Sequence, residues 1–244
     1  MSVNRNIAKT SVKVRLAMYK IDLHIHTKYS SACSIMTADM LALEYVKAGY
    51  SAIAITDHLN RVTYKDLLDS PKGEVGFREF IKGYENIKYE AEKYGLTVYR
   101  GAEIRFDGDP NDYLIFNYPD TLFNDLNDVM AMGLKNFYPL AKRAGALIIQ
   151  AHPCREICTP AAPNLLDGVE VANAHARHEN NNGLAEQFAN EHRHLIKIGG
   201  SDCHRPEDLG RGGIISDTLP KSDSELAELL KSGKYTILTT NIDI

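Results

Sequence analysis

The sequence lacks the features that mark several large classes of protein. It contains no apolar run near the roughly 18 residues that a membrane-spanning helix requires. Its basic residues 1–19 include no apolar core and no small-residue cleavage site, so we do not expect a secretory signal. The four cysteines form no CxxC pair and are too few for a disulfide framework in this length. We therefore predict a cytoplasmic protein with reduced thiols and no membrane partner.

An excess of positive charge is also missing. Lys and Arg number 28 against 32 Asp and Glu, which gives a formal net charge of −4 with neutral histidines. This balance argues against a protein that holds long nucleic acids by bulk positive charge. It allows a small anionic substrate, because such a substrate needs few cations. No repeat or low-complexity linker divides the chain, and the length suits one large domain or two small ones.

What the sequence does contain is an alternation of short apolar runs with longer helical patterns. The runs are almost continuously hydrophobic, which is typical of strands that are covered on both faces. The expected strands are residues 20–26, 52–56, 97–104, 113–117, 146–152, 168–172, 195–200 and 235–238. Seven or eight such units predict a small α/β protein of β/α-barrel type, with an open doubly wound sheet as the alternative. The glycines at 199–200 and 210–213 do not form the GxGxxG motif that would favour the open sheet.

Helix signals occupy the gaps between these runs. The expected helices, with their caps, cover residues 37–49, 77–94, 134–144, 184–192 and 222–233. Thr37 is a typical N-cap, and Ser222 with Glu225 forms a capping box. In residues 77–94 the apolar side chains recur at three- and four-residue steps and therefore form one stripe. Pro139 is expected to kink its helix.

Polar side chains gather where the expected strands end. Residues two apart on a strand point to one side, so His24 and His26 can face a common centre. In a parallel barrel the carboxyl ends of all strands meet on one face. That face would also hold Asp57, His58, Glu103, His152, Asp202 and His204. Imidazoles with carboxylates suit Zn, Mn or Fe rather than Ca. These donors are too many for one tetrahedral ion, so we expect two or three ions that share Glu103 and generate a hydroxide nucleophile near neutral pH.

Five motifs occur in an order that resembles one family. They are DLHIHTKYS, ITDH, GAEIRF, AHPCR and GSDCHRPEDLGRGG. Together they resemble the PHP (polymerase and histidinol phosphatase) superfamily, over roughly residues 20–240. The resemblance implies a distorted seven-stranded β/α barrel, similar to a TIM barrel, as one domain over residues 20–244. Residues 1–19 would be an N-terminal arm that is loose or adds a strand.

The resemblance also implies metal-dependent phosphoester hydrolysis at a di- or trinuclear site. One ion would be held by His24, His26, Glu103 and Asp202. Glu103 would bridge to a second ion at His152, and His58 with His204 would bind a third. Asp57 would be an orienter, a ligand or a proton carrier.

The chain departs from the fullest PHP pattern in two places. Some trinuclear members carry an extra histidine shortly after the HxH motif, and residues 28–34 contain none. Some also carry a histidine after the bridging glutamate, where this chain has Asp112. Asp112 is either a harder ligand of the second ion, which would favour Mn or Fe, or a turn residue before a strand.

A phosphorylated substrate would need cationic and polar groups near the ions. The candidates for phosphate binding are Arg105, Arg155 and Arg211. The substrate-side candidates, which are otherwise a polar loop, are Asn173, His175 and His178. The candidates for catalytic proton transfer are Asp57, His58 and His204. The glycines within residues 210–213 would let the backbone approach the ligand.

The leading interpretation is a stand-alone phosphoesterase that acts on a small phosphorylated molecule. Histidinol phosphate phosphatase, nucleotide phosphatase and short-oligonucleotide nuclease are alternatives with the same fold. A metal-dependent amidohydrolase is a more remote alternative, because such enzymes typically add a bridging carboxylated lysine. A non-catalytic metal-binding module ranks last, because the sequence retains every expected ligand motif. The oligomeric state has no visible signature.

Overall fold

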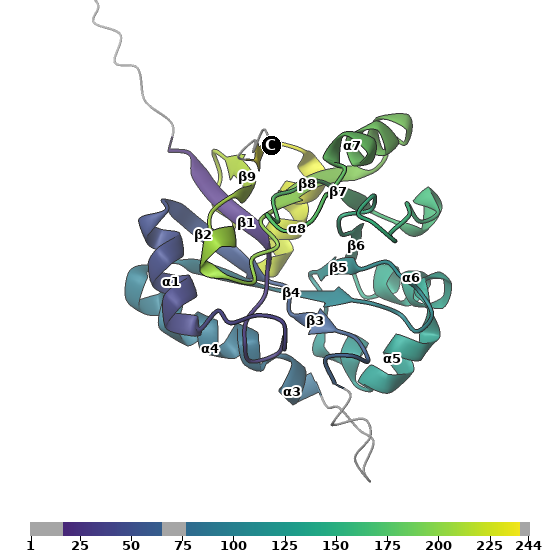
Figure 1. Ribbon diagram of the computed structural model, residues 1–244, viewed down its shortest axis with the longest axis horizontal. Coiled ribbons are helices and arrows are strands. Elements are labelled where there is room, and N and C mark those ends of the chain that lie inside the picture. The colour runs from purple at the N-terminus through teal and green to yellow at the C-terminus, as the bar shows by residue number, and fades with distance from the viewer. Residues whose placement is uncertain (1–16, 65–76, 240–244) are drawn as a thin grey trace, which may run out of the picture.

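A mixed sheet that curls into a nearly closed barrel forms the centre of the computed structural model, which describes residues 17–64 and 77–239 (Figure 1). Its strands are β1 (Tyr19–Ile25), β2 (Tyr50–Ile55), β3 (His58–Leu59), β4 (Thr97–Ile104), β5 (Tyr113–Phe116), β6 (Leu147–Gln150), β7 (Gly168–Asn173), β8 (Ile196–Gly200), β9 (Gly212–Ser216) and β10 (Thr236–Thr239). The predicted β/α barrel is thus confirmed, with ten strands in the described residues instead of seven. Residues 1–16 of the predicted arm lie outside the described residues, and Tyr19 already belongs to β1.

Helices cover the outside of this sheet (Figure 1). They are α1 (Ala38–Lys47), α3 (Phe77–Phe80), α4 (Lys82–Ala91), α5 (Leu126–Met132), α6 (Leu134–Arg143), α7 (Asn182–Glu191) and α8 (Asp223–Ser232). Short 3-10 turns are η1 (Glu92–Tyr94), η2 (Asp120–Phe123), η3 (Pro163–Leu165) and η4 (Pro206–Asp208). Thr37 and Ser222 cap α1 and α8 as predicted, because their hydroxyl oxygens accept from the backbone N–H of Met40 and Glu225. No helix within the described segments is long and apolar enough to cross a bilayer.

The direction of the strands departs from the parallel barrel that we expected. Neighbours follow the order β10-β9-β1-β2-β4-β5-β6-β7-β8, and β3 pairs with β4. β5 is antiparallel to β4 and β6, and β9 is antiparallel to β1 and β10. Residues 105–112 between β4 and β5 are too few for the crossover that a parallel pair needs. Because β5 is reversed, its start lies at the same end of the barrel as the end of β4, which brings Asp112 to that face.

The barrel closes where the chain leaves β8. There the N–H of Cys203 donates to the carbonyl of His24 at 3.2 Å, and the N–H of His26 donates to the carbonyl of Cys203 at 2.9 Å. These bonds place the segment after β8 directly beside the end of β1. Cys203 itself is fully buried in the apolar cluster under α1, so its side chain points away from the polar face, as the alternation of the DxH motif predicts.

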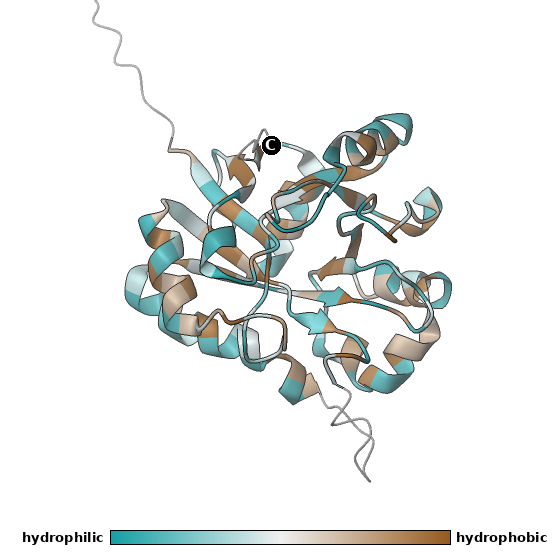
Figure 2. Cartoon of the chain, in the orientation of Figure 1, coloured by the Kyte–Doolittle hydropathy of each residue, from teal (hydrophilic) through white to brown (hydrophobic). Residues whose placement is uncertain are grey.

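Apolar side chains fill the spaces between the sheet and its helices, and brown segments recur along the strands and on the helices in Figure 2. One cluster joins α1 and α4 to β2, a second joins α8 to β1 and β8, and a third joins α5 and α6 to β5. Tyr45 on α1, Phe137 on α6 and Leu226 on α8 are almost fully buried. This packing fixes the strand ends, and thereby the polar side chains that follow them.

Candidate metal centre

Predicted ligands from separate strand ends meet at one end of the barrel. β1 supplies His24 and His26, β3 supplies His58, and β4 supplies Glu103. The remaining donors follow β6 and β8 and are His152, Asp202 and His204. Each of these side chains offers an atom to at least one group of three whose donor atoms lie within 4.8 Å of one another.

Glu103 is at the centre of this cluster. Its Oε1 lies 3.2 Å from Nε2 of His24 and 3.2 Å from Nε2 of His152. Its Oε2 lies 2.6 Å from Nδ1 of His58 and 3.4 Å from Nε2 of His26. The carboxylate therefore faces four imidazoles with both oxygens, the arrangement that a bridge between metal ions requires.

Asp202 joins the other side of the cluster. Its Oδ1 lies 3.5 Å from Nε2 of His24, 3.3 Å from Nε2 of His26 and 3.3 Å from Nδ1 of His204. Its Oδ2 accepts a hydrogen bond of 2.7 Å from Nη2 of Arg155. When ligand atoms lie about 2.1 Å from a tetrahedral zinc ion, the distance between any two of them is about 3.4 Å. The spacing of these atoms therefore fits ligands that surround shared cations.

Buried polar atoms without a hydrogen-bond partner give the clearest sign that the residues fit metal ions. Within the described residues they include Nε2 of His24, Nε2 of His26, Nδ1 of His58 and Oε2 of Glu103. A buried polar atom left unpaired costs about 1–3 kcal/mol. These atoms all face the centre of the cluster, where a divalent cation would satisfy them together.

Charge within the cluster is already balanced between acids and bases. Burial opposes the charging of His24, yet nearby carboxylates, that of Asp202 foremost, raise its pKa well above the usual value. Burial likewise opposes the ionisation of Glu103, but the rings of His24 and His58 hold its pKa well below the usual range. The pKa of His26 is lowered well below normal by burial and by neighbouring imidazoles. Ionised acids and a neutral imidazole are the states that metal ligands need.

Glu170 supports the cluster from behind. Its Oε1 lies 3.1 Å from Nδ1 of His24, so it fixes the ring whose Nε2 faces Glu103. Its Oε2 accepts hydrogen bonds from the backbone N–H of His152 at 3.0 Å and from Nδ2 of Asn173 at 2.9 Å. A carboxylate behind a ligating histidine orients the ring and increases its basicity.

Asp57 also supports the cluster from behind. Of the roles that the sequence leaves open for it, orienter, ligand or proton carrier, this position favours the first. Its carboxylate accepts hydrogen bonds from the N–H and hydroxyl of Thr27, at 2.6 and 2.7 Å, and from the hydroxyl of Ser31, at 2.7 Å. Ser31 Oγ also lies 3.3 Å from Nδ1 of His26 and accepts from the N–H of His58 at 2.9 Å. Asp57 therefore holds the loop that orients two ligands.

An open cavity of about 380 Å³ lies above the cluster. Its wall includes His58, His152, Asp202 and His204 from the cluster, and the arginines Arg105, Arg155, Arg177 and Arg205. The volume is within the range of pockets that take small molecules.

A PHP domain model matches residues 22–200, and a PHP-associated model matches residues 179–235. The chain belongs to the PHP family. The resemblance that the motifs indicate is thereby confirmed, and the cluster lies on the strand ends that carry the PHP motifs.

One curated relative of this PHP chain is the PolC-type DNA polymerase III of Clostridium perfringens. The two are 30% identical over 110 residues, which cover 45% of this chain and 7% of the polymerase. The match thus spans a small part of that relative's length.

Solved structures share the PHP fold at low sequence identity. A two-domain protein from Bacteroides vulgatus, described as containing a predicted PHP-like metal-dependent phosphoesterase, has a TM-score of 0.67 at 20% identity, with 91% of this chain and 65% of that one covered. A Bifidobacterium adolescentis protein proposed to be a metal-dependent phosphoesterase has a TM-score of 0.52 at 16% identity, with 92% and 98% covered. An amidohydrolase from Chromobacterium violaceum with bound sulfate has a TM-score of 0.53 at 16% identity, with 89% and 98% covered.

The arginines that we expected to bind phosphate have different surroundings. Arg155 lines the cavity, and its Nη2 and Nε also donate to Asn173 and Asn180. Arg105 lines it too and pairs with Asp112, whose Oδ2 lies 3.9 Å from Nε2 of His152. Asp112 is therefore beside the second predicted ion site.

Arg211 does not line the cavity. Its Nη1 donates to the carbonyl of Glu207 at 3.4 Å. The two neighbouring glycines that begin β9 have a structural reason of their own. A Cβ on Gly212 would lie 2.3 Å from the carbonyl oxygen of Gly200. These glycines therefore permit close contact between strands.

Two of the three substrate-side candidates, His175 and His178, line the cavity, whereas Asn173 does not. Asn173 is buried and links Arg155 to the carboxylates behind it. His175 and His178 line the wall, with Nδ1 of His178 3.1 Å from Oε1 of Glu156.

Sequence reasoning missed Glu170, Ser31 and Cys33. Glu170 had a visible signal, because it is an acidic residue inside the apolar run 168–172. Cys33 lines the cavity, and burial alone would raise the pKa of its thiol, but hydrogen bonds to His204 and His58 lower that pKa to about 6. Neither Ser31 nor Cys33 has a sequence signal that separates it from an ordinary loop residue.

Proposed function

We propose that this chain is a metal-dependent phosphoesterase that hydrolyses a small phosphorylated molecule. The observation that carries the proposal is the set of buried, unpartnered imidazole and carboxylate atoms directed at one centre beneath an arginine-lined cavity. Divalent ions bound there supply Lewis-acid charge and lower the pKa of water. The residues fit Zn, Mn or Fe, two or three ions in all, through the cluster together with Asp112.

The arginines of the cavity provide the selectivity for an anion. Arg155 is held by Asp202 and two asparagines, so its guanidinium is fixed in the wall before a substrate arrives. A fixed guanidinium binds phosphate oxygens with little loss of side-chain entropy. Arg105 faces the same cavity and is oriented by Asp112. These cations would bind the phosphate, while the remaining wall accommodates the organic group.

We assign proton donation to the leaving oxygen to His178. It lines the cavity and belongs to none of the ligand groups, whereas Asp57 is enclosed by Thr27 and Ser31. Glu156 at 3.1 Å orients the His178 ring. Burial lowers the pKa of the neighbouring His175 to about 4, so that ring is neutral and suits hydrogen bonding to substrate better than acid catalysis.

The leaving group tests this assignment. His178→Ala should reduce kcat about 100-fold or more for an alkyl phosphate, whose leaving oxygen needs a proton, and far less for 4-nitrophenyl phosphate. His194→Ala is the matched control, since His194 contacts the carbonyl of Pro163 elsewhere on the surface. Equal losses on both substrates would contradict the assignment.

The proposed function is tested by a substrate panel with metal-loaded protein. The panel should contain sugar phosphates, histidinol phosphate, nucleotides, a short single-stranded oligonucleotide and an N-acyl amino acid. We expect phosphate release from a small phosphorylated member and loss of that activity in His26→Ala. Turnover of the amide alone, or no turnover by fully loaded protein, would contradict the proposal.

A further inference from the structure

Cys33 lies on the cavity wall beside two of the predicted ligands. It belongs to the loop between β1 and α1, whereas His58 begins β3 and His204 follows β8. Cys33, His58 and His204 line the same cavity, and hydrogen bonds between the thiol and both rings lower the pKa of the thiol. Three segments that are distant in sequence thus bring a sulfur atom and two imidazoles together.

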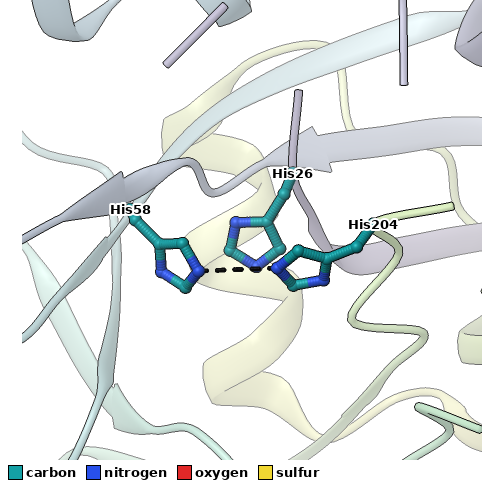
Figure 3. Close-up of side chains that lie close together, drawn as sticks. All are labelled: His26, His58 and His204. Carbon is teal, nitrogen blue, oxygen red and sulfur yellow. Dashed lines mark hydrogen bonds between the residues drawn. The ribbon is translucent and has the colours of Figure 1, made fainter. Parts of the chain in front are cut away.

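The two histidines face each other across a short gap. Their Nε2 atoms lie 3.4 Å apart, as the dashed line in Figure 3 marks. Nδ1 of His204 lies 2.9 Å from the carbonyl oxygen of Asp202, and Nδ1 of His58 lies 2.6 Å from Glu103 Oε2 without a hydrogen bond. The carbonyl oxygen at Nδ1 of His204 favours a lone pair on its Nε2, which then faces the Nε2 of His58, and two ring nitrogens this close suit a shared cation.

His26 supplies an independent sign of a ligand at this place. Its side chain is fully buried, and its Nε2 has no hydrogen-bond partner. Its ring centroid lies 4.2 Å from that of His58 and 4.1 Å from that of His204 (Figure 3). Donor atoms of the three rings all lie within 4.8 Å of one another.

We propose that Cys33 is a thiolate ligand of a divalent ion held by His58 and His204, with His26 as a further nitrogen donor. This inference rests on the proposed function, since it assigns one more ligand to the same centre. One sulfur and two or three imidazole nitrogens form a typical tetrahedral zinc set, and thiolate disfavours the harder Mn ion.

The consequence is a centre with two chemically different halves. The group of Glu103, Asp112 and His152 is rich in oxygen and suits a hard ion, whereas the Cys33 half suits zinc. Binding of zinc would also shield an otherwise exposed thiol from alkylation.

Cobalt substitution tests the thiolate ligand without any activity assay. Full-length protein is freed of metal, kept reduced with a phosphine and titrated with Co²⁺, and the near-ultraviolet thiolate-to-cobalt charge-transfer band is recorded. We expect the band in the unaltered protein and its loss in Cys33→Ser. Cys154→Ser is the matched control, because Cys154 lies outside the cavity lining. Cys158→Ser tests the other cavity thiol, whose Sγ lies 3.9 Å from Nδ1 of His152.

A second readout is alkylation of Cys33 by iodoacetamide, followed by peptide mass analysis. Zinc should slow the reaction at least about tenfold in the unaltered protein, and His58→Ala should abolish this protection. Bound cobalt without the band, a band that survives in Cys33→Ser, or a band that depends on Cys158 would overturn the thiolate ligand and leave the proposed function intact. Protein that binds no cobalt by elemental analysis would overturn both.

Discussion

At the scale of single residues, the ligands are held in costly conformations by partners behind them. His152 and Asp202 have positive φ angles of 27° and 53°, a region that residues other than glycine rarely adopt. Such strain costs about 1–3 kcal/mol per residue and persists where surrounding bonds fix it. Glu170 binds the backbone of His152, and Arg155 binds the carboxylate of Asp202. These contacts stabilise the ligand geometry from outside the cluster.

Glu170→Gln tests this support. The change keeps the shape of the side chain but removes the charge that fixes the His24 ring at 3.1 Å. Metal affinity should fall by about 10–100-fold, as is typical when a partner behind a ligand is removed. Isothermal titration with zinc measures the effect, and Glu186→Gln on the exposed face of α7 is the control. Equal affinities of the two variants would mean that Glu170 does not orient His24.

At the scale of elements, the loop after β1 is clamped between Asp57 and α4. Gly83 on α4 packs directly against this clamp, and a Cβ there would lie 1.9 Å from Oδ2 of Asp57 and 2.3 Å from Oγ1 of Thr27. The N–H of Gly83 also donates to Ser30 Oγ at 3.1 Å. A helix far from the metal ligands in sequence therefore sets the position of the loop that orients His26 and His58.

Gly83→Ala should move this loop. Overpacking of a filled site costs about 1–3 kcal/mol, so we expect that loss in the free energy of unfolding together with weaker zinc binding. Chemical denaturation measures the first quantity and titration the second. Gly183→Ala on α7 is the control, because a Cβ there meets nothing within 4 Å, and it should be neutral or stabilise by up to about 1 kcal/mol. A Gly83→Ala protein as stable as the control would refute the clamp.

Elements with a strong local signal were predictable from the sequence. The strand over residues 97–104 has the predicted bounds, and α1, α6, α7 and α8 lie within about two residues of theirs. The expected helix 77–94 is divided at Ile81 into α3 and α4, followed by η1. β3, β9 and α5 were missed, because they are very short or begin with a glycine pair that has low strand propensity.

The metal ligands could be predicted from the sequence, whereas the residues that surround and orient them could not. His24, His26 and Glu103 were visible because each interrupts or ends an apolar strand. The place of Arg211 outside the cavity lining was not visible in the sequence, because it depends on the loop after η4, which no pattern encodes. The antiparallel turn of β5 depends on tertiary pairing with β4 and β6 and was likewise invisible.

At the scale of the whole molecule, an acidic chain has a cavity lined by arginines. The net charge is −4, yet arginines line the cavity wall while their carboxylate partners Asp112, Asp202 and Asp208 are buried. Bound divalent ions would add further positive charge at its floor. An anionic substrate is therefore compatible with the overall acidity, because the arginines and bound ions at the cavity, and not the net charge, would act on it directly.

Metal binding should release protons at pH 8. Burial disfavours charged imidazoles, but hydrogen bonds and nearby acids raise the pKa of His152 to about 9 and that of His204 to about 10. In metal-free protein the protonated rings of His152 and His204 raise the free energy of unfolding. This contribution is complete below about pH 6.5 and is lost as the pH rises through 9 and 10. Zinc needs neutral rings, and the pKa values of His24 and His58 are raised as well, so at least two protons per chain should leave on binding, as an indicator dye in weak buffer would detect. Calcium, which prefers oxygen ligands, is the control. Zinc binding without proton release would contradict the ligand assignment.

The most direct test of the central claim, that this cluster is a multinuclear metal centre, is an elemental count of bound metal on purified protein. After incubation with zinc, manganese or iron and removal of the excess, the protein should retain about two or three divalent ions per chain. Glu103→Gln, which preserves size but removes the bridging charge, should retain about one or fewer. A protein that retains no ion, or a Glu103→Gln variant with the full count, would contradict the account.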